Sequence, residues 1–181
     1  MYLAIALSTA ASGAHSQHHD PGAHSHGVTE PSGTSPYASE PRREIQALSA
    51  DEQRAWLEGQ GAGLARAAEL NRHPGPMHVL ELAIQLGLSA DQARRSQVLM
   101  DSHKAEVREL GAQLVALERH LDRLFAVGAP VDGAEASRLA EAIGSMGGRI
   151  RASHLRTHIE QTALLSAAQV QRYNRLRGYE K

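Results

Sequence analysis

The chain contains no cysteine among its 181 residues. It therefore forms no disulfide bond and offers no thiolate to a metal, so histidine, methionine and carboxylate side chains are the available metal ligands. The net charge is also small, because 19 Lys and Arg residues are balanced by 20 Asp and Glu residues. A dedicated nucleic-acid-binding protein is normally strongly basic, and we do not expect a nucleic-acid partner.

Aromatic residues are scarce, with one Trp, one Phe and four Tyr. The core must therefore consist mainly of Leu, Ala, Val and Ile, which is thin for an isolated bundle of this length. Long helices with thin cores usually bury more surface against a partner. We expect one folded domain that forms a homodimer.

Patterns that indicate catalysis are missing as well. The chain has no HExxH, no Glu-x-x-His pair of the kind found in di-iron bundles, no glycine-rich phosphate loop after a strand and no cysteine nucleophile. A Ser-His-Asp set remains open, although no pattern points to one. We expect no enzymatic activity and no organic cofactor.

Residues 1–14, MYLAIALSTAASGA, resemble a short secretory signal. An apolar run from Tyr2 to Leu7 leads into small residues that suit cleavage around Ala14. The segment lacks the Lys or Arg of an ordinary signal, and an unstructured apolar N-terminus is the alternative. The run is too short to span a membrane, which takes about 20 apolar residues. Export without a membrane anchor is the prediction.

Residues 15–41 are rich in His, Ser, Gly and Pro and have almost no apolar periodicity. Such a composition buries too little surface to offset the entropy lost on ordering, so we predict a disordered tail. Clustered imidazoles on a flexible chain can bind Cu, Ni, Co or Zn, and a plain solvated linker is the alternative. The tail histidines are His15, His18, His19, His24 and His26.

Residues 42–181 form the predicted folded domain, which carries a net charge of about +2 because all 19 basic residues lie there. Three similar pentapeptides, LSADE, LSADQ and LSAAQ, each have a Ser followed three residues later by Glu or Gln. This spacing is a capping box, and it predicts helix starts near residues 49, 89 and 166. The predicted helices cover residues 50–71, 77–86, 90–127, 134–164 and 167–177.

Two of these helices are long and strongly periodic. Apolar residues recur at steps of three and four residues in both, which predicts one buried stripe on each. The connector between them, GAPVDG at 128–133, is short and favours an antiparallel pair. We therefore predict an all-α fold, built on a long antiparallel helical hairpin with shorter flanking helices. The stripes contain Val107, Leu110, Leu114, Leu117, Leu121 and Leu124 on the first helix and Leu139, Ile143, Met146 and Ile150 on the second.

The predicted hairpin brings histidines together. Pairing residues across the connector places His103, to within one turn, opposite position 156, midway between His154 and His158, which lie four residues apart on one helix face. Met100 and Glu106 lie about one turn to each side of His103. Three imidazoles with a thioether or carboxylate suit Zn, Cu, Ni or Co. The alternative is that these are hydrogen-bonded core histidines.

The pentapeptides LSADQ and LSAAQ also resemble the LTxxQ motif of the Spy/CpxP family of periplasmic proteins. The longer blocks AAELNRHPGPMHVLELAIQLGLSADQ (67–92) and ALLSAAQVQRYNRLRGY (163–179) are similar to a heavy-metal-resistance subgroup. The resemblance covers about residues 44–179. It implies a periplasmic, dimeric, curved helical cradle without enzymatic activity.

The resemblance implies two functions. Sensor members bind Ni, Co, Zn or Cu through His, Glu and Met, and one sensor pattern uses His pairs on an early helix together with HxxxM. Chaperone members hold unfolding client proteins on a mixed basic and apolar concave face. We expect a periplasmic metal-responsive protein, and the alternative is an ATP-independent holdase. An unfolded client or a membrane-bound regulator is the expected partner. The residues predicted to bind clients are Arg149, Arg151, Arg156, Arg172, Arg175 and Arg177.

Overall fold

The computed structural model describes residues 35, 37, 43–126, 128 and 130–180. These residues are mostly helical and contain no strand, which confirms the all-α prediction for the part described. Within the same residues, no helix is both long enough and apolar enough to cross a bilayer. The helices are α1 (Ala50–Glu58), α2 (Arg66–Glu69), α3 (Pro76–Glu81), α4 (Ala83–Leu86), α5 (Ala90–Leu124), α6 (Gly133–Ala163) and α7 (Ala167–Leu176).

The three predicted helix starts are confirmed with their capping boxes. In α1, α5 and α7 the Ser side chain accepts a hydrogen bond from the N3 amide, and the N3 side chain accepts one from the cap amide. The Gln side chains of the boxes at Ser89 and Ser166 also meet each other. Gln92 Nε2 lies 2.9 Å from Gln169 Oε1 and donates to the Leu164 carbonyl at 2.8 Å. The boxes therefore tie the start of α5 to the start of α7.

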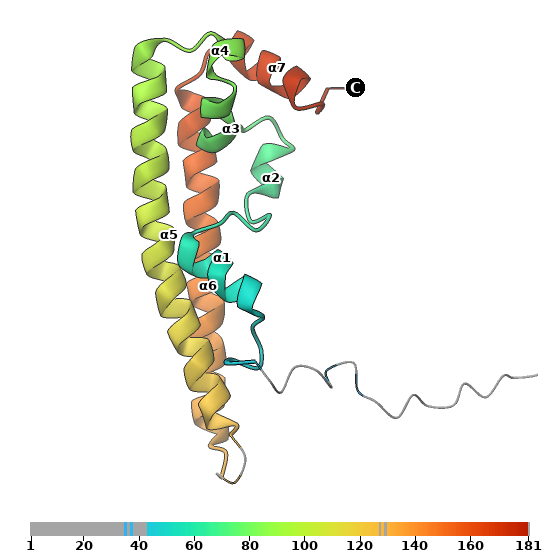
Figure 1. Ribbon diagram of the computed structural model, residues 1–181, viewed down its shortest axis with the longest axis vertical. Helices are drawn as coiled ribbons and strands as arrows, with labels where there is room; N and C mark the ends of the chain where they lie inside the picture. The colour runs from blue at the N-terminus through green and yellow to red at the C-terminus, as the bar shows by residue number, and fades with distance from the viewer. Residues whose placement is uncertain (1–34, 36, 38–42, 127, 129, 181) are drawn as a thin grey trace, which may run out of the picture. The chain divides into compact units, whose positions relative to one another are not determined.

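The two long helices, α5 and α6, lie side by side and run in opposite directions (Figure 1). Their shared core contains Val107, Leu110 and Leu114 of α5 and Ile150 of α6, with Met146 packed beside them. These residues come from the predicted stripes. Toward the connector the stripe on α5 is only half-buried, at Leu117, Leu121 and Leu124.

The short helices cover one side of this pair. Helix α1 packs on α5, where Trp56 contacts Val115 and Leu48. At the opposite end, α3, α4 and α7 enclose a separate core of Val79, Leu86 and Tyr173. The segment that joins α1 to α3 therefore crosses the middle of α5 and α6, and this crossing builds the candidate site.

Two predicted helices are interrupted. The helix predicted over residues 50–71 ends at Glu58, because Gly59 adopts the left-handed conformation with φ of 68° and terminates it. Helix α2 then begins only at Arg66. The helix predicted over 77–86 is divided at Leu82, whose φ of −98° and ψ of 16° lie outside the helical region. Both breaks bend the chain over the α5–α6 pair.

Gly111 sets the distance between α1 and α5. A Cβ atom at this position would lie 2.1 Å from the backbone oxygen of Trp56. We expect Gly111→Ala to lower the free energy of unfolding by about 2 kcal/mol, since overpacking outweighs the gain in helix propensity. Gly144→Ala is the matched control, because nothing lies within 4 Å of its Cβ position. It should stabilise α6 by up to about 1 kcal/mol. Urea denaturation of both variants measures the difference, and equal effects would contradict this packing.

Candidate functional site

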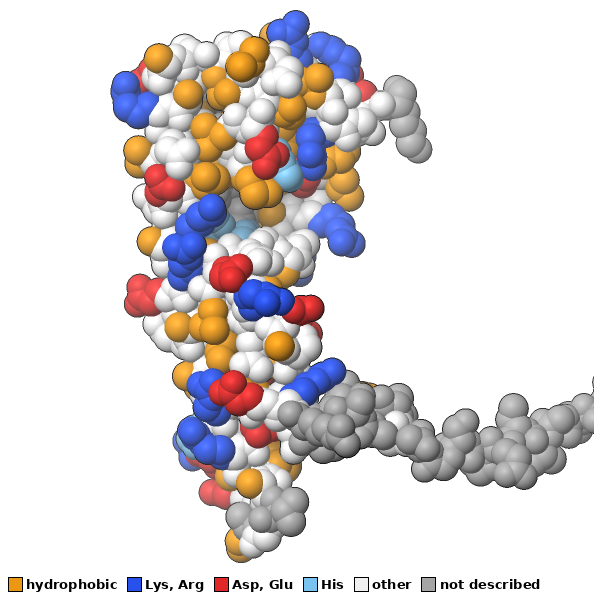
Figure 2. All heavy atoms as spheres, viewed as in Figure 1, with side chains coloured by type: hydrophobic (Ala, Val, Ile, Leu, Met, Phe, Trp, Pro, Cys, Tyr) orange, Lys and Arg blue, Asp and Glu red, His pale blue; other side chains and the backbone are white. Residues whose placement is uncertain are grey.

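A pocket of about 510 Å³ lies between the α5–α6 pair and the segment that crosses it. The pocket combines imidazoles, thioethers and glycine backbone in one place. Figure 2 shows histidine side chains among hydrophobic and charged groups in the upper half of the helical unit. The potential metal ligands that line the pocket are Glu69, Met77, His78, Met100, His103, His154 and His158.

A chain of hydrogen bonds joins α5 to α6 at the wall of the pocket. Arg156 Nη2 donates to both oxygens of Glu106, at 2.8 and 2.7 Å. Ser153 Oγ donates to Glu106 Oε2 at 2.7 Å and lies 3.1 Å from His103 Nδ1. His103 Nε2 lies 2.9 Å from His154 Nδ1, and the two rings meet edge to face at 4.4 Å. These five residues form a continuous chain, here called the relay.

The donor and the acceptor of each hydrogen bond in the relay follow from the charge of Glu106. The pKa of Glu106 is lowered by hydrogen bonds from Ser153 and Arg156, so its carboxylate can only accept. Ser153 gives its single proton to Glu106 and must therefore accept from His103 Nδ1–H. The bare Nε2 of neutral His103 then accepts from His154 Nδ1–H. This order leaves the Nε2 atom of His154 with a free lone pair.

The surroundings keep both imidazoles neutral. Burial lowers the pKa of His154 to about 4, with a further contribution from His103 and His158. Burial likewise lowers the pKa of His103, against the opposing effect of Glu106. His154 is only 5% exposed, and its Nε2 atom is buried without a hydrogen-bond partner. A buried polar atom without a partner is uncommon and calls for an explanation.

In His158, as in His154, the Nδ1 atom is the hydrogen-bond donor, but its acceptor is a different group. Its Nδ1 atom lies 2.7 Å from the carbonyl oxygen of His73, so Nδ1 carries a proton, and Nε2 is bare when the ring is neutral. A histidine that binds a metal commonly donates its other ring N–H to a carbonyl or carboxylate in this way. His154 and His158 both line the pocket from α6, and Gly75, another lining residue, lies beside the Nε2 atom of His158.

Glu69 of α2 connects the pocket to the C-terminal segment. Its Oε1 atom accepts from Tyr173 Oη at 2.5 Å and from Tyr179 Oη at 3.1 Å. Its Oε2 atom lies 3.5 Å from His158 Nδ1. Burial, and then the bond to Glu69, raises the pKa of Tyr173. Glu69 was not among the predicted site residues, because its tyrosine partners lie about a hundred residues away and no local pattern marks the contact.

His103 meets Ser153 and His154, and Glu106 meets Ser153 and Arg156, so the register lies within one turn of the predicted pairing. The ring nitrogens of His103 face Ser153 and His154, and His158 has a different partner, the His73 carbonyl. Met100 does line the pocket, as do all three histidines. Among the described residues, no group of three or more His, Asp or Glu side chains is arranged as a metal site.

The arginines predicted to bind clients have varied surroundings. Arg156 belongs to the relay, Arg175 lies 3.8 Å from Glu180, and Arg172 donates to the Gln85 carbonyl. Arg177 packs over the Tyr179 ring at 5.8 Å. Arg149 and Arg151 are exposed on α6. The tail histidines His15, His18, His19, His24 and His26, like the signal-like segment, lie outside the described residues.

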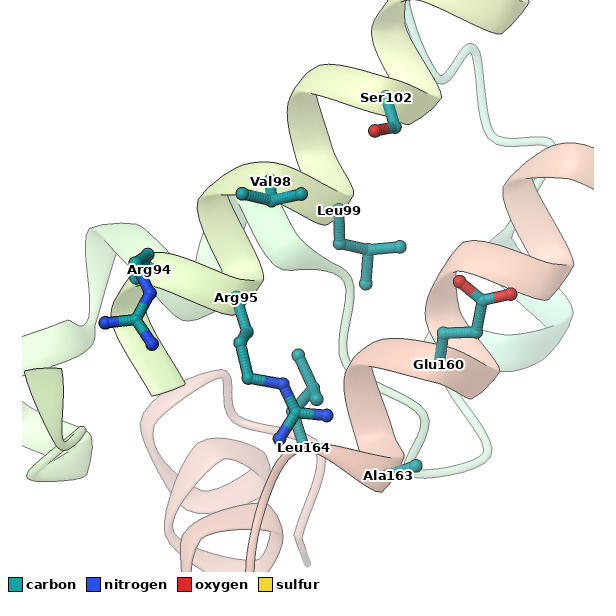
Figure 3. Close-up of a pocket in the computed structure, with 8 residues that line it drawn as sticks. All are labelled: Arg94, Arg95, Val98, Leu99, Ser102, Glu160, Ala163 and Leu164. Atoms are coloured by element: carbon teal, nitrogen blue, oxygen red, sulfur yellow. The ribbon is translucent and has the colours of Figure 1, made fainter. Parts of the chain in front are cut away.

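A second hollow of about 570 Å³ lies where α5 starts and α6 ends. Figure 3 shows Leu99 reaching toward α6 and Arg95 extending toward Leu164, with Glu160 on the opposite wall. The remaining lining residues are Arg94, Val98, Ser102 and Ala163. This hollow combines an apolar floor with a basic edge and offers no metal ligands beyond one carboxylate.

Comparison of the chain with protein-family models, with curated proteins and with solved structures finds no match.

Proposed function

We propose that this protein binds a late transition metal ion, Cu, Ni, Co or Zn, and serves as a non-enzymatic, metal-responsive protein of the periplasm. The proposal rests on the buried, unpartnered Nε2 atom of His154. Imidazole nitrogens with free lone pairs are good ligands for these ions. Binding an ion would supply the partner that this atom otherwise lacks.

The donor atoms around the pocket fit such an ion. His154 and His158 lie four residues apart on α6, which places two imidazoles on one helix face. Met100 lines the same pocket from α5. His103 and Glu106 enter the proposal as positioning residues instead of ligands, since hydrogen bonds occupy both ring nitrogens of His103 and both oxygens of Glu106. Their role is to fix the tautomer of His154.

Calorimetric titration of the full chain tests this function. The five tail histidines are replaced by Gln in every variant, so that only ligands from residues 42–181 are measured. We expect one ion per chain, and we expect the double variant His154→Ala, His158→Ala to lose the binding.

His120→Ala is the matched control. His120 lies on the same helix as His103, and it is exposed and outside the pocket. It should bind as the parent does. Equal affinity in the parent and in the double variant, with both folded by circular dichroism, would refute a site on α6.

A holdase is the second candidate function, favoured by exposed apolar surface beside arginines. Val98 is 61% exposed and lines the hollow of Figure 3 together with Arg94 and Arg95. Ile84 of α4, outside this hollow, is 94% exposed. Such mixed surface can hold a partly unfolded chain. Suppression of client aggregation by metal-free protein, with loss of the effect in Val98→Ser, would support this function. Full suppression by that variant would argue against this surface.

The homodimer and the curved cradle belong to the same proposal. The two long helices with a thin core are what favour a second copy. Sedimentation of the full chain over a range of concentrations tests this expectation, and a monomer at every concentration would contradict it.

A further inference from the structure

The donor atoms of the pocket differ in kind from those of an ordinary divalent-metal site. The two free imidazole nitrogens, of His154 and His158, come with the thioethers of Met100 and Met77. Thioether sulfur is a soft ligand that selects Cu(I) over harder divalent ions, whereas imidazole binds Zn, Cu and Ni alike. A preference for Cu(I) over divalent ions would therefore come from the methionine sulfurs.

The carboxylates near the pocket are engaged through all but one oxygen. Both oxygens of Glu106 accept from Ser153 and Arg156, and Glu69 Oε1 accepts from Tyr173 and Tyr179. Glu69 Oε2 is buried without a hydrogen-bond partner, 3.5 Å from His158 Nδ1, so a hard divalent ion would find a single free carboxylate oxygen there.

The net charge of the pocket lining also favours a monovalent ion over a divalent one. The cationic side chains of Arg66 and Lys104 line the pocket, against the single carboxylate of Glu69. With neutral histidines, the lining is positive by one charge. Placing a divalent ion there costs more electrostatic free energy than placing a monovalent one, because the like-charge repulsion doubles.

We propose that the ion bound in this pocket is monovalent copper, Cu(I), held by His154 Nε2, His158 Nε2 and the Met100 thioether. The inference rests on the proposed function and narrows its metal to one oxidation state. Met77, which is half exposed on α3, also lines the pocket and is not required for binding.

The test compares Met100→Leu with Met146→Leu in the full chain, with the five tail histidines replaced by Gln. Leu keeps the volume of Met and removes the sulfur. Met146 packs in the α5–α6 core and does not line the pocket, so it is the matched control. Anaerobic competition with a chromophoric Cu(I) chelator measures Cu(I) affinity, and calorimetry measures Zn, Ni and Co.

We expect the parent to bind Cu(I) most tightly. Met100→Leu should weaken Cu(I) binding by about tenfold or more without changing Zn binding, and Met146→Leu should change neither. Zn, Ni or Co bound as tightly as Cu(I), or an unchanged Cu(I) affinity in Met100→Leu, would overturn the inference and leave the histidine site standing. Absence of any binding that depends on His154 and His158 would overturn the proposed function as well.

Discussion

Lowering the pH from 7 to 5 is expected to remove about 2 kcal/mol from the stability of the metal-free protein, and about 3 kcal/mol by pH 4. The cause is His154, whose pKa in the folded state is lowered from 6.5 to about 4 by burial. Between these values the unfolded state binds a proton that the folded state does not. The stability from this group is therefore fully present above pH 6.5 and is lost as the pH falls to about 4. Burial of His103 acts in the same direction.

Urea denaturation at a series of pH values measures this loss, and His154→Gln is the control. Gln keeps a donor for His103 but does not titrate, so the curve of this variant should be flatter between pH 7 and 5. The carboxylates of Glu52 and Glu106 have lowered pKa values and contribute only at lower pH, since both titrate below 4.5. The same slope in His154→Gln as in the parent would show that His154 is not the titrating group.

Saturating metal is expected to stabilise the folded protein by about 4 kcal/mol when free metal is a thousand times Kd. The effect follows because His154 and His158 converge only in the folded state. Thermal unfolding with and without metal, in the variant without tail histidines, measures it as a rise in Tm.

The double variant His154→Ala, His158→Ala should show no rise in Tm with metal. A lower starting Tm in this variant does not affect the comparison, because the measured quantity is the change on adding metal. A rise equal to that of the parent would place the stabilising ion elsewhere in the chain.

Part of this site could be predicted from the sequence, because it depends on contacts between residues that are close together in the chain. The capping boxes at Ser49, Ser89 and Ser166 fix helix starts through contacts within four residues. The short connector then makes α5 and α6 antiparallel. These two features were sufficient to bring His103 close to His154.

The remainder depends on contacts that are remote in sequence. To predict the relay, the register of α5 against α6 must be known to within half a turn. Counting residues across a loop does not give this precision. The pocket also needs the segment between Gly59 and Met77 to cross the helix pair, and its path depends on the left-handed turn at Gly59. The bond from Glu69 to Tyr173 joins residues 104 positions apart. Only the folded chain brings such groups together.

Nitrogen-15 NMR of the imidazole rings tests the central claim most directly. The claim is that the relay and the His73 carbonyl hold His154 and His158 as Nδ1–H tautomers, with both Nε2 atoms free to bind one ion. Long-range proton–nitrogen spectra at pH 7 should show both rings in this form, and added Cu(I) should shift both Nε2 resonances together. Protonated Nε2 atoms in the metal-free protein, or Nε2 resonances that do not move when metal is added, would contradict the account.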